Sequence, residues 1–350
     1  MLPEWVYQQC PDSSAVHREA AVARQAQLTK PTGALGRLEQ LAIELAGLQA
    51  TEQPRAARVP IIIFAGDHGI VAQGVSAYPQ EVTIAMLANF ASGGAAISVL
   101  ARELGSSLEV VDAGTLAHEE MAGIVTDKPR SSTRDFSAEA ALTPTELAFA
   151  FEAGLRAVTR AQAGQPDLLI FGEMGIGNTT TSAAIAAGLL GVSAEEIAGS
   201  GTGVDAAGRA HKARVIDAAI ARHGIAGGSP EKILCAVGGL EIAAICGAII
   251  AAAQRRIPVL IDGFIVSVAA LVAARLNPSC QPFLLASHQS AEQGHRLVLR
   301  ALNVQPLISL DLRLGEGSGA AIALPLVRSA CALHNGMATF AQANVPDRPA

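Results

Sequence analysis

The stretch Asp167–Leu190 reads DLLIFGEMGIGNTTTSAAIAAGLL and contains, in order, an apolar run, a glycine-rich turn and a helical pattern. After its first residue, the run Asp167–Phe171 is continuously apolar, which is typical of a strand that is covered on both faces. The glycine-rich turn leads into Ser182–Leu190, whose alanines and leucines favour a helix. A strand, a turn and a helix in this order predict one unit of a parallel sheet.

The same order recurs along the chain. Repetition of this unit predicts a mostly parallel, Rossmann-like α/β sheet with right-handed crossovers and helices on both faces. Ligands of such sheets bind beyond the carboxyl ends of the strands, so we expect the functional site in the loops there. The further predicted strands are Val59–Ala65, Leu108–Val111, Ile233–Val237, Pro258–Ile261 and Pro282–Ala286, and the clearest predicted helices are Glu241–Gln254, Phe264–Leu276 and Ala291–Leu302.

The two ends of the chain have helical patterns outside this repeat. The segment up to about Gln53 predicts two helices that are interrupted at Lys30–Gly33, where Pro31 and Gly33 disfavour a continuous helix. A further helix is predicted from Ser318 to His334, and the residues after it read as a loose tail.

Composition excludes several classes of protein. The net charge is −6 and no basic run is present, so we expect no nucleic-acid partner. The five cysteines are scattered, which fits a reducing cytoplasm better than a disulfide framework. The longest apolar stretch, Ile242–Ala253, is shorter than the roughly 20 residues that cross a bilayer, and Met1–Asp12 does not resemble a signal peptide. We therefore expect a soluble cytoplasmic protein without a membrane partner.

Two glycine-rich segments are candidate anion sites. In the turn after Phe171, glycines let backbone N–H groups approach an anion at a helix N-terminus, although a capped helix after a tight turn would have the same sequence. The second segment, Gly199–Asp205, precedes a helix that carries Lys212. A lysine there can reach a phosphate, whereas on charge alone an ordinary solvated helix face is the favoured interpretation.

Two further segments carry groups that could do chemistry. Glu316 lies between glycines in LRLGEGSGA, on a backbone that a ligand can approach closely, but a carboxylate that interacts with a helix dipole would look the same. Asp67 and His68 follow a predicted strand. With Asp112, Asp262 and His288 they could bind a metal, yet no His or Cys spacing here is diagnostic of a metal site. A structural or substrate-shaping role for Asp67 and His68 is favoured instead.

Six segments in register resemble the nicotinate-nucleotide–dimethylbenzimidazole phosphoribosyltransferases. Agreement extends roughly from Lys30 to Arg328. The segments are KPTGALGRLE at Lys30–Glu39, GDHGIVAQGVSAYPQEVT at Gly66–Thr83, GEMGIGNTT at Gly172–Thr180, GTGVD at Gly201–Asp205, HQSAEQGH at His288–His295 and LRLGEGSGA at Leu312–Ala320. The resemblance implies a homodimer with a large α/β domain, at residues 41–328, and a small helical domain from both termini, at residues 1–40 and 329–350.

The resemblance also implies an activity and the residues for it. The reaction would move ribose 5-phosphate from nicotinate mononucleotide to 5,6-dimethylbenzimidazole with inversion, without metal or cofactor, giving nicotinate and α-ribazole 5′-phosphate for cobalamin assembly. Glu316 would be the general base, and Glu173 would stabilise positive charge or hold the ribose hydroxyls. The implied phosphate and nucleotide contacts are Gly175, Gly177, Asn178, Thr179, Gly203, Lys212, Asp262 and Ser290, and the implied walls of the base pocket are Ser76, Tyr78, Gln80, Met86 and Leu314.

Two alternative functions make different predictions. A metal-dependent hydrolase built on Asp67, His68, Asp112 and His288 would lose activity in a chelator. A nucleotide-binding regulatory protein would have no turnover to lose when Glu316 becomes Gln. The sequence leaves open the preferred base and the role of Lys30–Glu39.

Overall fold

In the computed structural model of this chain, the described residues are 1–201 and 203–346; Thr202 of the GTGVD motif and the last four residues of the tail lie outside them. A six-stranded sheet forms the centre, and each pair of neighbouring strands in it is parallel. Its strands are β1 (Ile61–Gly66), β2 (Leu108–Gly114), β3 (Val125–Thr126), β4 (Leu169–Met174), β5 (Val259–Ile261) and β6 (Leu284–Ala286).

The strand order is β3-β2-β1-β4-β5-β6, so the chain moves outward from β1 in one direction, returns, and moves outward from β4 in the other. β1 and β4 are neighbours, paired from Ile61 with Ile170 to Ala65 with Met174. This is the order of a doubly wound fold, and β1 and β4 flank its switch point, where ligands bind at the carboxyl ends of the strands. The predicted Rossmann-like sheet is confirmed.

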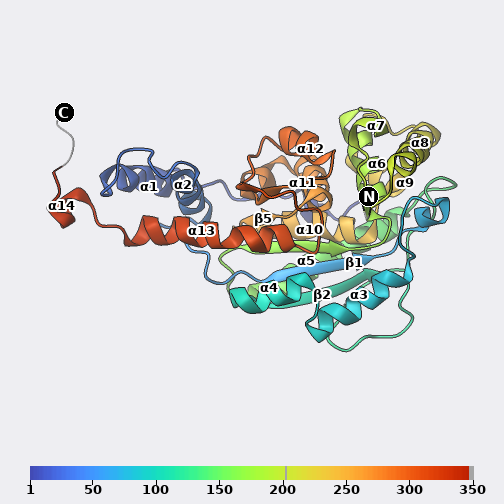
Figure 1. Cartoon of the computed structure of the whole chain (residues 1–350), viewed down its shortest axis with the longest axis horizontal. Coiled ribbons are helices and arrows are strands. Elements are labelled where there is room, and N and C mark those ends of the chain that lie inside the picture. Colours follow the sequence, from blue (N-terminus) through green and yellow to red (C-terminus); the bar gives the residue numbers. More distant parts are fainter. Residues whose placement is uncertain (202, 347–350) are drawn as a thin grey trace.

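Helices cover both faces of the sheet (Figure 1). Opposite directions of strand progression place right-handed crossover helices on opposite faces. On one face α3 (Glu81–Ser92) packs on β1 and β2, and α13 (Ser318–Gly336) packs on β4 and on α4 (Ala96–Leu104). On the other, α10 (Leu240–Gln254) packs on four strands and lies between α5 (Pro144–Gln162) and α11 (Phe264–Leu276). Because α10 is covered all round, its sequence is apolar all round.

Further elements extend beyond the carboxyl ends of the strands. The helix α6 begins directly after β4, and the short parallel pair β7 and β8 lies beyond β6. These elements are α6 (Asn178–Leu190), α7 (Ala194–Ile197), α8 (Ala206–His223), α9 (Pro230–Val237), α12 (His295–Leu302), β7 (His288–Gln289) and β8 (Ile308–Ser309), together with the 3-10 turn Gly69–Gln73. A further 3-10 turn, Pro278–Phe283, leads into the amino end of β6.

The prediction of a strand at Ile233–Val237 is wrong, because these residues form most of α9. The Ser229 side chain accepts a hydrogen bond from the Lys232 amide, and Pro230 occupies the first helical position. Both are start signals of a helix, and they outweigh the apolar run, which by itself fits a buried helix as well as a strand. The predicted start of α12 is also wrong by four residues, because Ala291–Gly294 form a turn before His295.

Helices from the two termini pack together away from the sheet, as Figure 1 shows. They are α1 (Ala15–Gln27), α2 (Arg37–Gln49), the far half of α13 and α14 (Phe340–Ala343), while the 3-10 turn Glu4–Tyr7 packs on α10. The Arg24 guanidinium donates to the carbonyls of His334, Asn335 and Met337 at the end of α13. The expected domain boundaries, after residues 40 and 328, fall inside α2 and α13.

The motif Lys30–Glu39 forms the turn between α1 and α2. Its two end residues make an ion pair of 2.8 Å, from Lys30 Nζ to Glu39 Oε1, and both side chains are largely buried. The Leu35 amide donates to the same carboxylate oxygen. The motif therefore closes its own turn, which is a structural role that the sequence did not reveal.

One segment, Glu81–Leu104, is 24 residues long and has a mean hydropathy of 1.7, enough by length and composition to cross a membrane. Only 33% of its most apolar window is buried in this structure. Gly93, with a φ of 83°, ends α3 in the left-handed conformation and separates it from α4. The segment is thus two helices of 12 and 9 residues, each shorter than a bilayer requires.

Candidate active site

A cavity of about 310 Å³ lies beyond the carboxyl ends of β4, β5 and β6. Its walls come from α3, from the turn between β4 and α6, from the segment after β5 and from the loop before α13. The residues predicted for the site that line it are Tyr78, Met86, Glu173, Gly175, Asn178, Thr179, Ser290, Leu314 and Glu316. One cavity therefore collects the candidate base, most of the candidate phosphate contacts and much of the expected base pocket.

Glu316 lies on a strained backbone at the wall of this cavity. Its φ is 63°, and Gly315 and Gly317 on either side also have positive φ values, 90° and 78°. A positive φ is uncommon for a residue with a side chain, and glycine neighbours make such a turn accessible. Glu316 is 6% exposed, and its Oε2 accepts a hydrogen bond of 3.3 Å from the Ile97 amide at the start of α4.

The surroundings of Glu316 favour the protonated form of its carboxyl group. Burial raises the pKa of this carboxyl above its ordinary value, and the neighbouring Asp262 carboxylate raises it further, while the hydrogen bond from Ile97 lowers it. A carboxylate whose pKa is raised toward the operating pH is suited to general-base catalysis.

Asp262, at the end of β5, holds the loop of Glu316 in place. Its carboxylate is buried and accepts hydrogen bonds from the Gly317 amide, at 3.1 Å, and from the Ala320 amide, at 2.9 Å. It thereby satisfies two of the unpaired amides at the N-terminus of α13. Asp262 was predicted as a nucleotide contact, but the structure places it behind the cavity wall, on the amide of the residue next to Glu316.

Glu173 lies near the end of β4 and is 5% exposed. Asn178 donates its side-chain amide to Glu173 Oε2. Burial raises the pKa of the Glu173 carboxyl well above its ordinary value, and the carboxylates of Asp262, Glu241 and Glu316 raise it further. Three acids line the cavity, Glu173, Glu292 and Glu316. Of the two whose pKa is raised, Glu173 has three neighbouring carboxylates that raise it and Glu316 has one.

The turn from β4 into α6 forms the phosphate loop, which we define as Gly175–Thr179. A side chain at Gly175 would lie 2.1 Å from the carbonyl oxygen of Gly66, so only glycine fits there. Gly177 has a φ of 99° and caps α6. The first amides of a helix lack intrahelical partners, and they favour an anion.

Lys212 supports this loop from α8. Its side chain is buried, and its Nζ donates to Thr179 Oγ1 at 2.7 Å. Burial lowers the pKa of this lysine to about 8, and the nearby Glu292 carboxylate acts in the opposite direction. A β-carbon on Gly201 would lie 2.6 Å from the same Thr179 hydroxyl, so the second glycine-rich segment closes over the pair.

The other end of the cavity is apolar and open. Its side chains include Val82 and Met86 of α3, Phe264 and Leu314. Tyr78 and Leu314 are 53% and 60% exposed. This end offers flat apolar surface next to Glu316.

Some predicted site residues do not line the cavity. Lys212 and Asp262 lie behind it, as described above. Gln80 caps α3 and donates its side-chain amide to the His68 carbonyl at 2.9 Å, and Ser76 accepts from the Tyr78 amide. Gly177 is part of the phosphate loop but does not itself line the cavity. Gly203 lines a neighbouring cavity of about 390 Å³ together with Arg209 and Arg313.

The cavity also has walls that sequence reasoning missed. Glu292 and Arg313 line both cavities. They belong to the HQSAEQGH and LRLGEGSGA segments that carry the family resemblance, so the sequence contained a signal that could have identified them. Phe264 and Ile265 directly follow β5, where the rule for parallel sheets places ligand contacts. The remaining missed residues are Val82, Met174, Ile176, Gly201, Gly263, Leu312, Gly315 and Ser318. His288 also lines the cavity, although the sequence suggested it only as a metal ligand.

Of the residues considered as metal ligands, Asp262 and His288 form an ion pair of 3.9 Å, whereas Asp67, His68 and Asp112 have other partners. Asp112 accepts from Lys128 Nζ at 2.6 Å, and Asp67 accepts from the Leu116 amide. His68 pairs with Glu241, and Asp262 caps α13. Among residues 1–201 and 203–346, no three His, Cys, Asp or Glu side chains form a group that could hold a metal ion.

Comparison with known proteins identifies the family of the chain. A family model described as phosphoribosyltransferase matches residues 10–345. A nicotinate-nucleotide–dimethylbenzimidazole phosphoribosyltransferase of Bradyrhizobium diazoefficiens is 91% identical over 350 residues, which is 100% of both chains. The chain belongs to the nicotinate-nucleotide–dimethylbenzimidazole phosphoribosyltransferase family. The resemblance read from six segments of sequence is confirmed.

More distant members of this phosphoribosyltransferase family match over the whole length. One from Pseudomonas putida strain W619 is 55% identical, with 100% of both chains covered. The crystal structure of CobT from Thermus thermophilus superposes with a TM-score of 0.90 at 42% identity, covering 95% of this chain and 100% of the other. The doubly wound fold described above is therefore the fold of the family.

Proposed function

We propose that this phosphoribosyltransferase moves ribose 5-phosphate from nicotinate mononucleotide to 5,6-dimethylbenzimidazole with inversion, giving α-ribazole 5′-phosphate and nicotinate for the lower ligand of cobalamin. The names of the full-length relatives support the substrates. The cavity supports this combination of a nucleotide and an apolar base, because a phosphate loop lies at one end and an apolar surface lies at the other, beside Glu316.

The proposed reaction needs one base and no general acid. In nicotinate mononucleotide the ring nitrogen is a cationic pyridinium, so the electrons of the breaking bond to C1′ leave it as neutral nicotinate nitrogen. The incoming benzimidazole forms its bond to C1′ through one nitrogen and loses the proton of the other. Glu316 accepts that proton as general base. Attack from the face opposite nicotinate converts a β-linked substrate into an α-linked product.

The nucleotide is held from the other end of the cavity in this proposal. The phosphate rests on the amides of the phosphate loop, with Thr179 and the Lys212 ammonium beside it. Glu173 binds the ribose hydroxyls rather than stabilising positive charge, because its raised pKa increases the fraction of neutral carboxyl. Ser290 lies on the same wall.

The single observation that carries the mechanism is the position of Glu316, a residue that is only 6% exposed and lines the cavity. The test is formation of α-ribazole 5′-phosphate by the wild type, Glu316→Gln and Glu173→Gln. Removal of a general base lowers kcat about 10²–10⁴-fold, so Glu316→Gln should lose nearly all turnover while its KM for nicotinate mononucleotide stays close to wild type. Glu173→Gln keeps a hydrogen-bonding side chain and should retain more activity.

Glu103→Gln is the matched control, because Glu103 is an exposed glutamate on α4 that does not line the cavity. Full activity of the Glu316→Gln protein would remove Glu316 from the mechanism. Absence of product from folded wild type would contradict the substrates.

We also propose that the enzyme is a cytoplasmic homodimer of two-domain subunits, with residues 1–40 and 329–350 in the small domain. Val99 on α4 and Ile322 and Leu326 on α13 are apolar and exposed, and the two helices pack together. Unburied apolar surface of this kind is typical of a subunit contact. Light scattering of the wild type and of Ile322→Asp tests it; a monomeric wild type would contradict the proposal.

A further inference from the structure

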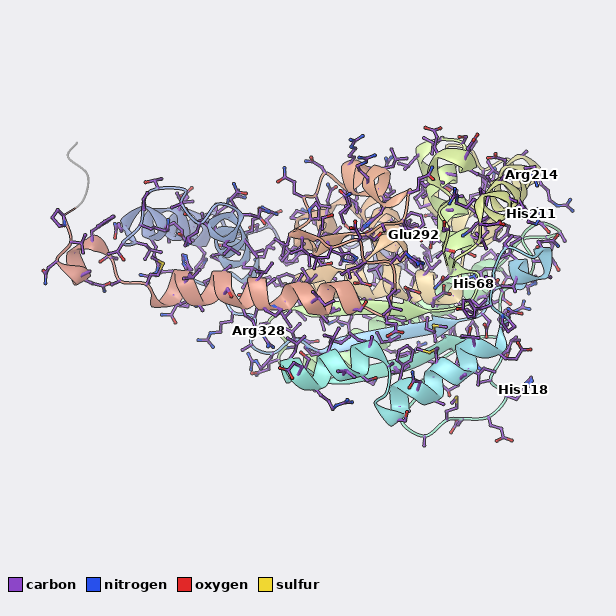
Figure 2. The ribbon with its side chains drawn as sticks, viewed as in Figure 1. His68, His118, His211, Arg214, Glu292 and Arg328 are labelled. Carbon is purple, nitrogen blue, oxygen red and sulfur yellow. The ribbon has the colours of Figure 1, made fainter. Side chains whose placement is uncertain are left out.

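We propose that the buried pair of His68 and Glu241 is a positioning device that sets the phosphate loop from behind, with Thr181 as the link to α6. His68 follows β1, and Figure 2 shows it at the end of the strands. This inference rests on the proposed role of Gly175–Thr179 as the phosphate site, and it concerns residues that touch no substrate in the proposed mechanism.

The His68 ring has a defined partner on each nitrogen. Its Nε2 lies 2.8 Å from Glu241 Oε1, and because a carboxylate can only accept, this nitrogen carries a proton. Its Nδ1 lies 2.9 Å from the hydroxyl of Thr181 in the first turns of α6. All three side chains are completely buried. The ring is therefore fixed in orientation by two elements, α10 and α6.

The phosphate loop packs directly on this ring. A β-carbon on Gly175 would lie 3.3 Å from His68 Nε2, and one on Gly177 would lie 3.1 Å from His68 Cβ. The other side of the ring is more closely packed, because a β-carbon on Gly239 would lie 2.6 Å from His68 Cε1. A change in the ring would therefore displace the loop that carries the amides for the phosphate.

The direct hydrogen bond between His68 and the base end is made by the His68 backbone. Gln80 Nε2 donates to the His68 carbonyl at 2.9 Å, which ties the start of α3 to the same residue. A change that moves the ring but not the backbone should therefore disturb the nucleotide more than the base. This difference separates positioning from a general loss of structure.

A buried polar pair of this kind is weak evidence for stability, because the cost of desolvating both groups offsets the attraction between them. The second oxygen, Glu241 Oε2, has no hydrogen-bond partner among the described residues, so the pairing is not optimised for stability. Removal of either partner would leave a buried polar group alone and could unfold the protein. The link, Thr181, is the better place to test the device.

The chain offers a matched control next to Thr181. Thr180 is also on α6 and completely buried, but its hydroxyl has no hydrogen-bond partner among the described residues. Thr181→Val and Thr180→Val each replace a hydroxyl by a methyl group in the same helix turn. Thr181→Ser keeps the hydroxyl that reaches His68 and removes only the methyl group.

The experiment measures kcat, KM for each substrate and the thermal midpoint of the wild type and these three variants. Thr181→Val should raise the KM for nicotinate mononucleotide about fivefold or more, since misplacement by a fraction of an ångström is costly. Its KM for dimethylbenzimidazole should stay within about twofold, as should both KM values of Thr180→Val and Thr181→Ser.

Several results would overturn the proposal. One is a wild-type KM for nicotinate mononucleotide in folded Thr181→Val. Another is equal impairment of the two valine variants, and a third is a Thr181→Ser protein as impaired as Thr181→Val, because the hydroxyl would then be irrelevant. If Thr181→Val does not fold, Glu241→Gln, which keeps an acceptor for His68 Nε2, takes its place with the same expectation.

A Thr179→Val variant distinguishes the positioning role of His68 from the proposed phosphate site on which it rests. If Thr179→Val leaves the KM for nicotinate mononucleotide unchanged, the phosphate is bound elsewhere and the proposed phosphate site fails. If Thr179→Val raises that KM and Thr181→Val does not, the phosphate site stands and only the positioning role fails.

Discussion

The two ends of the cavity are built in different ways. At the phosphate end, polar groups are buried and paired in fixed directions: Lys212 with Thr179, His68 with Glu241 and Thr181. At the base end, apolar side chains form the wall, and Tyr78 and Leu314 are more than half exposed. One end is defined by hydrogen bonds, and the other by apolar surface.

This difference predicts different selectivity for the two substrates. A buried hydrogen-bonding site rejects a ligand that leaves its groups unpaired, whereas one methylene of misfit in an apolar pocket changes binding by only about 1–3 kcal/mol. The enzyme should therefore be strict about the nucleotide and tolerant about the base. Each of the following changes tests one end against the other.

The largest effect should come from the phosphate end. Lys212→Met removes a charged donor, and since hydrogen bonds to charged groups contribute about 1.5–3 kcal/mol, the KM for nicotinate mononucleotide should rise about 10–150-fold. The KM for dimethylbenzimidazole should hardly change, as steady-state kinetics would show. Lys232→Met, on α9 and away from both cavity walls, is the control. Equal effects on both substrates would erase the distinction between the ends.

A pH profile gives the next largest effect. Burial lowers the pKa of Lys212 to about 8, so the ammonium is present below that pH and is lost as pH rises through it. In the free enzyme, kcat/KM for nicotinate mononucleotide should fall by up to about tenfold per pH unit above the pKa. Lys212→Arg stays charged, so any activity that it retains should not show this decrease at alkaline pH. If Lys212→Arg shows a decrease of the same slope, a group other than Lys212 causes it.

A smaller effect is expected at the base end. Leu314→Ala removes partly exposed apolar surface, which at about 25 cal/mol per Å² should raise the KM for dimethylbenzimidazole about three- to fivefold and leave that for nicotinate mononucleotide unchanged. Leu310→Ala is the matched control, because Leu310 is 57% exposed but does not line the cavity. If the two variants behave alike, Leu314 does not contact the base.

The smallest effect should come from chelation. The phosphate end provides amides and the Lys212 ammonium for the anion, so EDTA should leave the initial rate within assay error of the untreated enzyme. A rate that falls in EDTA and returns with added Mg²⁺ or Zn²⁺ would show that a metal binds the phosphate or the base. That result would also support the alternative function of a metal-dependent hydrolase.

Much of the fold was accessible from local patterns. Five of the six predicted strands exist, since apolar runs followed by small or acidic residues are characteristic of buried parallel strands. The exception, Ile233–Val237, fails because such a run does not distinguish a buried helix from a strand; the cap at Ser229 and Pro230 does. The very short β3, β7 and β8 exist only through their partners and carry no signal of their own.

For the candidate site, residues on glycine-rich turns were easier to find than residues on cavity walls. Glu316, Glu173 and the phosphate loop occur in recognisable segments, and all of them reach one cavity. Phe264, Ile265 and Val82 look like ordinary core residues in the sequence. Only their position in space, around the same cavity as Glu316, makes them walls.

By itself, the sequence determined the parallel architecture, the family and the carboxylate on a glycine-flanked turn, because these depend on residue type and short-range spacing. Only the tertiary structure decided what lies behind the site: Asp262 on the amides next to Glu316, and the His68 ring between Glu241 and Thr181. His68 and Glu241 are 173 positions apart in the chain. Such pairs are fixed by packing of distant elements, and local sequence patterns carry no record of them.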